Sequence, residues 1–184
     1  MGKIIVSEFM SLDGVIEAPE TWHFPYLSDE MGAYSAAQIN GSDAFLMGRV
    51  TYDNFAGFWP TQTHNEFGFA DKLNNAPKFV VSTTLLKADW NHTTLINRNV
   101  VESITRLKQQ VSGNIGITGS ATLIQTLMQA DLVDQYQLLI HPIVVGKGKR
   151  LFQEGIATLP LKLVETRTFP NGVVLLVHQP AREA

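Results

Sequence analysis

Short apolar runs rich in β-branched residues alternate along the chain with segments whose apolar positions recur at helical spacing. The short runs are bounded by Gly, Asp, Asn or Ser and predict strands at residues 3–9, 44–47, 78–82, 93–96, 114–118, 135–145, 161–169 and 173–179. Helix signals mark the segments that begin at Ser28 and after Arg49 and those at 66–75, 100–111 and 121–130, and we expect about four helices in all. This alternation favours an α/β protein.

Two of the predicted helices carry start signals. Ser28 is a favoured N-cap residue, and Asp29 and Glu30 follow it, where carboxylates suit the positive end of the helix dipole. Asn99 precedes the clearest helical pattern, and Glu102 completes a capping box with it. The signals predict where both helices begin.

The last two predicted strands are typical of a β-hairpin. They are joined through Pro170, Asn171 and Gly172, and an Asn-Gly pair supplies the positive φ angles that a tight hairpin turn needs. Because helices separate most of the earlier strands, we expect those strands to be parallel. The predicted fold class is a mostly parallel sheet of about eight strands with helices on both faces and an antiparallel C-terminal hairpin, in one domain over residues 1–184.

Composition narrows the range of functions. The 184-residue chain has 14 basic and 17 acidic side chains, a net charge of -3 and no cysteine. The lack of cysteine excludes disulfides, zinc-thiolate sites and thiol nucleophiles. Because there is no Lys/Arg-rich run and no long apolar stretch, we expect no nucleic-acid or membrane partner and a cytoplasmic location. We also expect no metal site, because the histidines lack paired ligand spacing; they are His23, His64, His92, His141 and His178.

A polar segment follows the second predicted strand where a helix begins. Residues 47–52, Met-Gly-Arg-Val-Thr-Tyr, combine a glycine that permits close approach, the donor fork of Arg49 and the hydroxyl of Thr51. Helix N-termini bind anions, and ligands of α/β sheets lie beyond the carboxyl ends of the strands. The segment is typical of a phosphate site, but a strand-to-helix turn with a solvated arginine explains it equally well.

A second such segment covers residues 113–122, Gly-Asn-Ile-Gly-Ile-Thr-Gly-Ser-Ala-Thr. Backbone N–H groups from Gly119 to Thr122 could contact a pyrophosphate with no large side chain in the way. The glycines do not follow the G-x-G-x-x-G pattern, and no P-loop lysine is present. A generic helix cap is the alternative, but two such segments on one small sheet favour a nucleotide-like ligand.

Two further polar clusters are candidate parts of a site. Ser82 and Thr83 end a predicted strand, although Ser and Thr also satisfy backbone groups in ordinary turns. Lys147, Lys149 and Arg150 are interleaved with glycine. They could bind a substrate phosphate or form a solvated charged loop.

The segment 11–27 is a long loop of about 17 residues without clear periodicity, and loops of this length are commonly functional lids. Trp22 and its aromatic neighbours would give this loop an apolar surface suited to binding. The candidate acids are Asp13 in this loop and Asp29 and Glu30 at the following helix start, although such carboxylates more often serve as loop or capping residues.

Several segments, in their order along the chain, resemble dihydrofolate reductases. They are Ser-Leu-Asp-Gly-Val-Ile at 11–16, Trp-His-Phe-Pro at 22–25, Met-Gly-Arg-Val-Thr-Tyr at 47–52, Val-Val-Ser at 80–82 and Ile-Thr-Gly-Ser at 117–120. Residues 119–152, which include Pro-Ile-Val-Val-Gly-Lys-Gly at 142–148, resemble still more closely the reductase domain of the bacterial bifunctional riboflavin-biosynthesis protein. The resemblance extends over the chain apart from its last few residues.

The resemblance implies a dihydrofolate reductase-like fold with NADPH lying across the carboxyl edges of the strands. Cofactor contacts carried over by motif are Gly48, Arg49 and Thr51 for the phosphates, Ser82 and Thr83 for the adenosine 2'-phosphate, Gly119, Ser120, Ala121 and Thr122 for the pyrophosphate, and Ser11, Val15 and Ile16 in a loop over the nicotinamide. The candidate substrate contacts are Trp22, Lys147, Lys149 and Arg150, and Asp13, Asp29 or Glu30 would assist proton delivery.

The implied activity is that of an NADPH-dependent reductase acting like the 5-amino-6-(5-phosphoribosylamino)uracil reductase of riboflavin biosynthesis, which delivers a hydride to a sugar carbon. A dihydrofolate or pterin reductase is an alternative, but the carboxylate that orients a pterin aligns with Leu27. A non-catalytic NADP-binding protein of the same fold is the other. A chain without cysteine lacks the zinc-site residues of the deaminase that accompanies such reductases. Riboflavin-type relatives often pair subunits, so we expect a homodimer.

Overall fold

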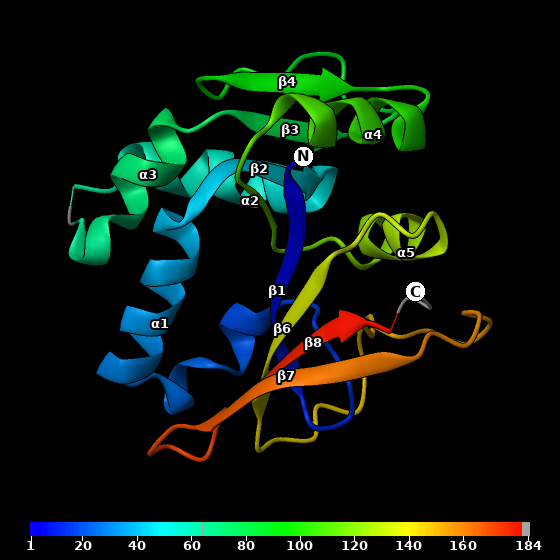
Figure 1. The fold of residues 1–184 in the computed structure, drawn as a ribbon. Coiled ribbons are helices and arrows are strands. Elements are labelled where there is room, and N and C mark those ends of the chain that lie inside the picture. Colours follow the sequence, from blue (N-terminus) through cyan, green and yellow to red (C-terminus); the bar gives the residue numbers. More distant parts are fainter. Residues whose placement is uncertain (64, 182–184) are drawn as a thin grey trace.

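A computed structural model describes residues 1–63 and 65–181 of the chain, and His64 lies outside the described residues. The described residues form an eight-stranded sheet in the order β4-β3-β2-β5-β1-β6-β8-β7 (Figure 1). The strands are β1 (Lys3–Ser11), β2 (Ser42–Gly48), β3 (Lys78–Val81), β4 (Thr93–Ile96), β5 (Asn114–Ile117), β6 (Gln135–His141), β7 (Leu161–Thr168) and β8 (Val174–Pro180). The helices are α1 (Asp29–Asn40), α2 (Arg49–Phe58), α3 (Phe69–Asn75), α4 (Val100–Gln110) and α5 (Ala121–Gln129).

The predicted mostly parallel sheet with an antiparallel C-terminal hairpin is confirmed. β8 pairs antiparallel with β6 and β7, and the six strands from β4 to β6 pair in parallel. The described chain has five α-helices, where the sequence predicted about four. The helix predicted after Arg49 is α2, which runs for 10 residues, and its Tyr52 and Phe55 pack into an apolar cluster with β2 and β3.

Helices cover the two faces of the sheet differently. On one face, α4 and α5 pack on a continuous core that includes Ile4, Ile115 and Leu127. On the other face the core is divided. One cluster, around Phe45 and Met47, lies under α2 and α3, and a second joins Met31 of α1 to Leu139, Phe169, Val173, Leu175 and Val177 of β6 and the C-terminal hairpin. Between these two clusters lie the central strands β5 and β1.

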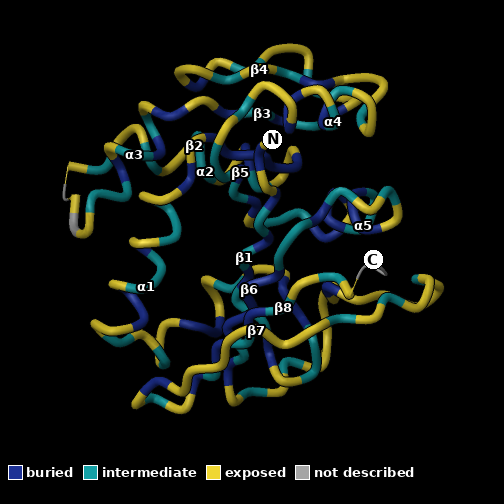
Figure 2. Tube along the Cα trace, in the orientation of Figure 1, coloured by how far each residue is buried: buried dark blue, intermediate teal, exposed yellow. Residues whose placement is uncertain are grey.

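Burial follows this arrangement along the sheet. The central strand β6 is mostly buried, whereas the edge strand β7 is exposed along nearly its whole length, as Figure 2 shows. Leu163 and Val164, which lie at a β-bulge of β7, are 50% and 51% exposed. The sheet thus ends in an uncovered edge strand with two exposed apolar side chains. Among the described residues, no helix has both the length and the apolar character needed to cross a bilayer.

Local signals were right at α1 and wrong at α4. The Ser28 hydroxyl accepts a hydrogen bond from Met31 N at 3.3 Å, as an N-cap residue does. Asn99 precedes α4 but adopts a left-handed conformation with φ 48°, and its side chain makes no capping bond in the described structure. Only its main-chain carbonyl serves the helix, by accepting from Ser103 N. The predicted capping box is therefore wrong.

Two predicted strand ends also differ. The strand predicted over 135–145 stops at His141, because Pro142 cannot donate to a ladder and the Ile143 carbonyl instead accepts from Leu12 N at 2.8 Å. In the hairpin, Gly172 alone of the turn residues has a positive φ, at 84°. Gly172 N donates to the Phe169 carbonyl, so the chain turns through three residues and Asn171 keeps an ordinary φ.

Candidate functional site

The central strands leave one face of the sheet partly uncovered. Ile4 and Ile117, on the face of α4 and α5, are 0% and 1% exposed. On the opposite face Ser7, Phe9 and Gly116 are only half-buried, and Thr118, beyond the end of β5, is exposed. We call these four residues the central strip. It lies between the two divided apolar clusters and reaches the carboxyl ends of β1 and β5, where ligands of parallel sheets bind.

The two predicted phosphate segments meet at this edge. They follow β2 and β5, which are neighbours in the sheet. A methyl group added to Gly48 would lie 2.3 Å from Ser120 Oγ, and one added to Gly119 would lie 2.6 Å from Thr51 Oγ1. Gly119 also has a positive φ of 70°. Glycine is therefore required at both positions for the turns to pack together, and the two segments form one polar surface.

The helices that start from these turns have the features of anion sites. In the described structure, neither α2 nor α5 has a side-chain N-cap bond or an acidic residue in its first turn. By contrast, acidic residues stand in the first turns of α1, α3 and α4. The first N–H groups of α2 and α5, which have no intrahelical partner, and the positive ends of both helix dipoles remain available to an anion.

Arg49 adds an exposed, weakly paired positive charge to this surface. It is the first residue of α2, and its guanidinium contacts Asp53 one turn later at 2.9 Å. Both side chains are close to half-exposed, so the pair is weak and easily exchanged for a stronger anion. Arg49 can therefore turn its donors toward a ligand at the start of α2 without leaving a buried charge behind.

The next strand ends carry polar residues as well. Ser82, at the end of β3, uses its hydroxyl to accept from Thr84 N and Leu85 N at 3.2 and 2.9 Å, as in an ordinary hydroxyl turn. Thr83 is exposed beside it. Sequence reasoning missed Arg98, which is exposed just beyond β4, the strand that pairs with β3. A basic residue soon after a predicted strand end was the available signal.

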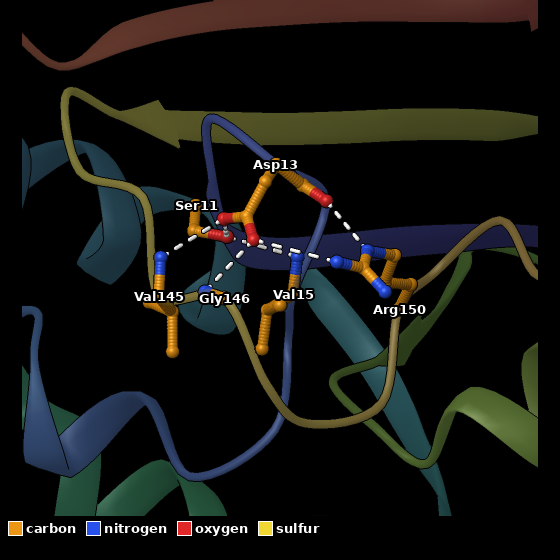
Figure 3. A network of polar contacts seen from close by, with 6 residues as sticks. All are labelled: Ser11, Asp13, Val15, Val145, Gly146 and Arg150. Atoms are coloured by element: carbon orange, nitrogen blue, oxygen red, sulfur yellow. Dashed lines mark hydrogen bonds and ion pairs between the residues drawn. The ribbon is translucent and has the colours of Figure 1, made fainter.

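The loop after β1 is bound to the segment 143–151. Figure 3 shows Asp13 at the centre of this contact: its carboxylate accepts from Ser11 Oγ at 2.7 Å, from Val145 N at 3.0 Å and from Gly146 N at 2.9 Å. The Ser11 hydroxyl, and next the backbone N–H of Val145, lower the pKa of Asp13 to about 2. The group is ionised at neutral pH, and we name this contact the Asp13 latch.

Other predicted loop residues serve the same contact. The Ser11 hydroxyl accepts from Val15 N at 2.9 Å, and Val15 forms a backbone bridge with Arg150. Ile16 packs into the core under α4 and α5. Lys149 lies 3.9 Å from Glu17, so Lys149 and Arg150 both face acidic groups of the loop. Lys147 is exposed and has no ion pair among the described residues.

The two carboxylates at the start of α1 lie on the surface. Asp29 and Glu30 are both exposed, and Glu30 makes an ion pair with Arg167 of β7 at 3.0 Å. The structure therefore does not bring these two carboxylates together with Asp13, which is held in its latch.

Trp22 belongs to an aromatic cluster that sequence reasoning did not anticipate. His141, at the end of β6, is fully buried, and its ring lies 5.2 Å from that of Trp22, 5.4 Å from Phe9 and 6.2 Å from His23. Burial lowers the pKa of both histidines, and for His23 the nearby His141 adds to the effect. Both rings are therefore neutral at neutral pH. Phe9 also belongs to the central strip, so the cluster forms one wall of it.

Glu8 is a further polar residue of this region that was not predicted as part of the site. It lies in β1 with 5% exposure, and its Oε1 accepts from Gly119 N at 2.5 Å. Burial raises its pKa to about 8, against a smaller lowering by the Gly119 bond. The signal in the sequence was an acidic residue two and four positions after Val6 and Ile4, on the apolar side of an alternating strand pattern.

The fold is that of the dihydrofolate reductase-like α/β proteins. A dihydrofolate reductase from Enterococcus faecalis, solved in complex with NADP(H), matches 98% of this chain and 97% of its own with a TM-score of 0.65 at 14% identity. A family model described as the RibD C-terminal domain matches residues 2–175. The chain belongs to that family.

Individual relatives agree with this assignment. The uncharacterized protein YyaP of Bacillus subtilis (strain 168) is 34% identical over 184 residues, which cover 96% of this chain and 94% of YyaP. A Shewanella sp. PV-4 structure named for riboflavin biosynthesis has a TM-score of 0.78 at 21% identity and covers 98% of this chain and 99% of its own. The chain also matches, at 98% coverage, 16% identity and a TM-score of 0.68, 57% of a Thermotoga maritima diaminohydroxyphosphoribosylaminopyrimidine deaminase/5-amino-6-(5-phosphoribosylamino)uracil reductase.

Proposed function

We propose that the protein is an NADPH-dependent reductase. The observation that carries the proposal is the packing of the β2–α2 turn against the β5–α5 turn, beside Arg49. The two helices that begin there, α2 and α5, have neither a side-chain N-cap bond nor an acidic residue in the first turn. Membership of the RibD C-terminal domain family and the likeness to a dihydrofolate reductase solved with NADP(H) support it.

The residues at this edge suit the cofactor chemically. Phosphates need N–H donors and positive charge, which the first turns of α2 and α5 and the guanidinium of Arg49 supply. We assign Gly48, Arg49, Thr51 and Gly119, Ser120, Ala121, Thr122 to the phosphates, and Ser82, Thr83 and Arg98 to the adenosine end. The half-buried central strip would then receive the nicotinamide and the substrate side by side.

The cofactor, when bound, supplies a hydride, and the protein supplies orientation and a dry surface. Asp13 holds the first loop in place through its latch and is ionised at neutral pH, so it is a poor proton donor. Of the three candidate carboxylates, Asp13 and Glu30 make ion pairs with Arg150 and Arg167, and the exposed Asp29 would assist proton delivery by way of water. Trp22 and the aromatic cluster would bound the substrate.

For the substrate, we propose a phosphorylated aminopyrimidine, as in the name of the Thermotoga maritima structure. The exposed Lys147 would meet its phosphate. A pterin is less suited, because the position expected to carry a pterin-orienting carboxylate is Leu27, which is 55% exposed and apolar. We also propose pairing of two copies through the exposed apolar edge at Leu163 and Val164.

The test is NADPH binding by the wild type and by Arg49→Ala, measured by quenching of protein fluorescence. Arg106→Ala is the matched control, because Arg106 also makes an exposed ion pair one turn away in its helix, at 2.9 Å from Glu102. Loss of a charged phosphate contact should weaken binding by about tenfold in Arg49→Ala and leave the control unchanged. Equal affinities of the two variants, or no binding by the wild type, would contradict the proposal.

Measuring turnover distinguishes the proposed aminopyrimidine reductase from a pterin reductase and from a non-catalytic NADP-binding protein. NADPH oxidation with the phosphoribosylamino-pyrimidine and not with dihydrofolate is expected. Activity with dihydrofolate alone would replace the proposed substrate with a pterin. Binding of NADPH without turnover of any pterin, aminopyrimidine or small carbonyl would identify a non-catalytic NADP-binding protein.

A further inference from the structure

Glu8 occupies a place where an apolar residue would be expected. In β1 the side chains of Ile4 and Val6 point into the core beneath α4 and α5, and the two-residue period of a strand directs Glu8 to the same side. Its neighbour in β6, Leu138, belongs to that core. Glu8 itself is only 5% exposed. It is thus a buried carboxyl group on a central strand.

The Glu8 carboxyl group has a specific polar partner. Gly119 N donates to Glu8 Oε1 at 2.5 Å, across 111 positions of the sequence. Gly119 is the residue before Ser120, the N-cap of α5, and a methyl group on Gly119 would collide with Thr51 Oγ1. The turn is therefore bounded on two sides: Glu8 accepts its N–H from the sheet, and Thr51 packs close to it from the start of α2.

Keeping a carboxyl group at this place is costly. Burial disfavours its charged form, and no ion pair compensates Glu8 among the described residues. A leucine or methionine would fill the volume without that cost. An apolar side chain cannot accept a hydrogen bond from the half-buried Gly119 N–H, which would then lose its acceptor in the fold.

We propose that Glu8 is a positioning residue for the phosphate-binding turn: its carboxyl oxygen holds the Gly119 N–H and so sets the direction in which the N-terminus of α5 presents its N–H groups. The inference rests on the proposed function, because the phosphates in question are those of NADPH. Glu8 acts through Gly119 and does not itself touch the cofactor. An acceptor oxygen, charged or neutral, is what the role requires.

Two substitutions distinguish the effect of the Glu8 acceptor oxygen from the effect of its negative charge. Glu8→Gln keeps an acceptor oxygen of the same reach, and Glu8→Leu removes it at similar volume. Lys108→Met is the control for loss of a buried polar contact, because Lys108 is 4% exposed and its Nζ donates to the Leu132 carbonyl at 2.8 Å, just before β6 begins and so at the end of the sheet away from the Gly119 turn. The measurements are the NADPH dissociation constant, the melting temperature and the proton shift of the Gly119 amide in NMR spectra.

The expected results differ between the variants. Glu8→Gln should bind NADPH within about threefold of the wild type and keep a downfield Gly119 amide, whereas Glu8→Leu should lose that shift and about tenfold in affinity. Lys108→Met should lower the melting temperature without changing the affinity. A folded Glu8→Leu that binds as the wild type does, or a folded Glu8→Gln with the leucine variant's loss, would overturn the proposal.

The possible negative results can be told apart. If Glu8→Leu does not fold, the Gly119 shift and the affinity of Glu8→Gln decide the matter. If the wild type does not bind NADPH, the proposed function fails. If the wild type binds NADPH and a folded Glu8→Leu binds it with the same affinity, only the positioning role of Glu8 fails.

Discussion

Arg150 is bound to Asp13 at two points: its Nε donates to the Asp13 main-chain oxygen at 2.9 Å, and its Nη2 lies 3.5 Å from the Asp13 carboxylate. Together with the hydrogen bonds from Val145 and Gly146, these contacts join the loop after β1 to the segment after β6 (Figure 3). The loop lies at the carboxyl end of β1, beside the central strip, and we expect these contacts to restrict its motion relative to the segment after β6.

Removing the Asp13 carboxylate should release both segments. In Asp13→Ala the amides of Val15, Val145 and Gly146 should exchange with deuterium faster, because the acceptor of two of them is lost and Ser11 is no longer held. Native-state hydrogen exchange measures this directly. Glu20→Ala, which removes an exposed carboxylate of the same loop outside the latch, is the control. Unchanged protection at Val145 and Gly146 would show that the latch does not hold the loop.

The Asp13 latch should also be insensitive to pH in the neutral range. Its hydrogen bonds lower the pKa of Asp13 from 3.8 to about 2, so the stabilisation is fully present above the unfolded pKa and is lost only as pH falls through the folded one. The exchange difference between the wild type and Asp13→Ala should therefore stay constant from about pH 5 to pH 8.

Glu8 should have the opposite dependence, in the stability of the whole fold. Burial raises its pKa from 4.5 to about 8, so between these values the folded chain keeps a proton that the unfolded chain has lost. The contribution of Glu8 to stability therefore falls as pH rises through this window, and levels off above it.

Urea unfolding of the wild type and Glu8→Gln at several pH values measures this contribution, because other titrating groups cancel in the difference. The free energy of unfolding of the wild type should decline relative to Glu8→Gln by up to about 1.4 kcal/mol per pH unit between the two pKa values. A difference that does not change with pH would mean that the Glu8 carboxyl group does not titrate differently in the folded chain.

Replacing Lys78 should cost far more stability than replacing the exposed Lys87. Lys78 is fully buried at the start of β3, and its Nζ donates to the carbonyls of Leu73 and Ala76 at 2.7 and 2.8 Å, which satisfies the end of α3. Lys78→Met fills the space but leaves these acceptors unpaired, so the free energy of unfolding should fall by about 2–4 kcal/mol. Lys87→Met, at an exposed lysine, should change it by less than about 0.5 kcal/mol. Equal urea midpoints for both variants would contradict this role.

Local signals predicted the order of strands and helices, the Ser28 cap and the two polar turns after β2 and β5, because each depends on neighbours within a few residues along the chain. Even so, Asn99 shows the limit of such signals, since its left-handed backbone prevents the side-chain cap that its sequence predicts. The alternation of these elements predicted one mostly parallel sheet, which the strand pairing confirms, and the resemblance to a known family added the dihydrofolate reductase-like fold.

Only the tertiary structure decided the partners of the buried and half-buried polar groups. From its position in β1, the sequence could show that Glu8 points inward, but its partner Gly119 is 111 residues away, and Asp13 meets Val145 across 132. Sequence periodicity determines which face of a strand or helix a side chain occupies. It does not determine which distant backbone N–H arrives there, because that depends on how the strands order and pack in three dimensions.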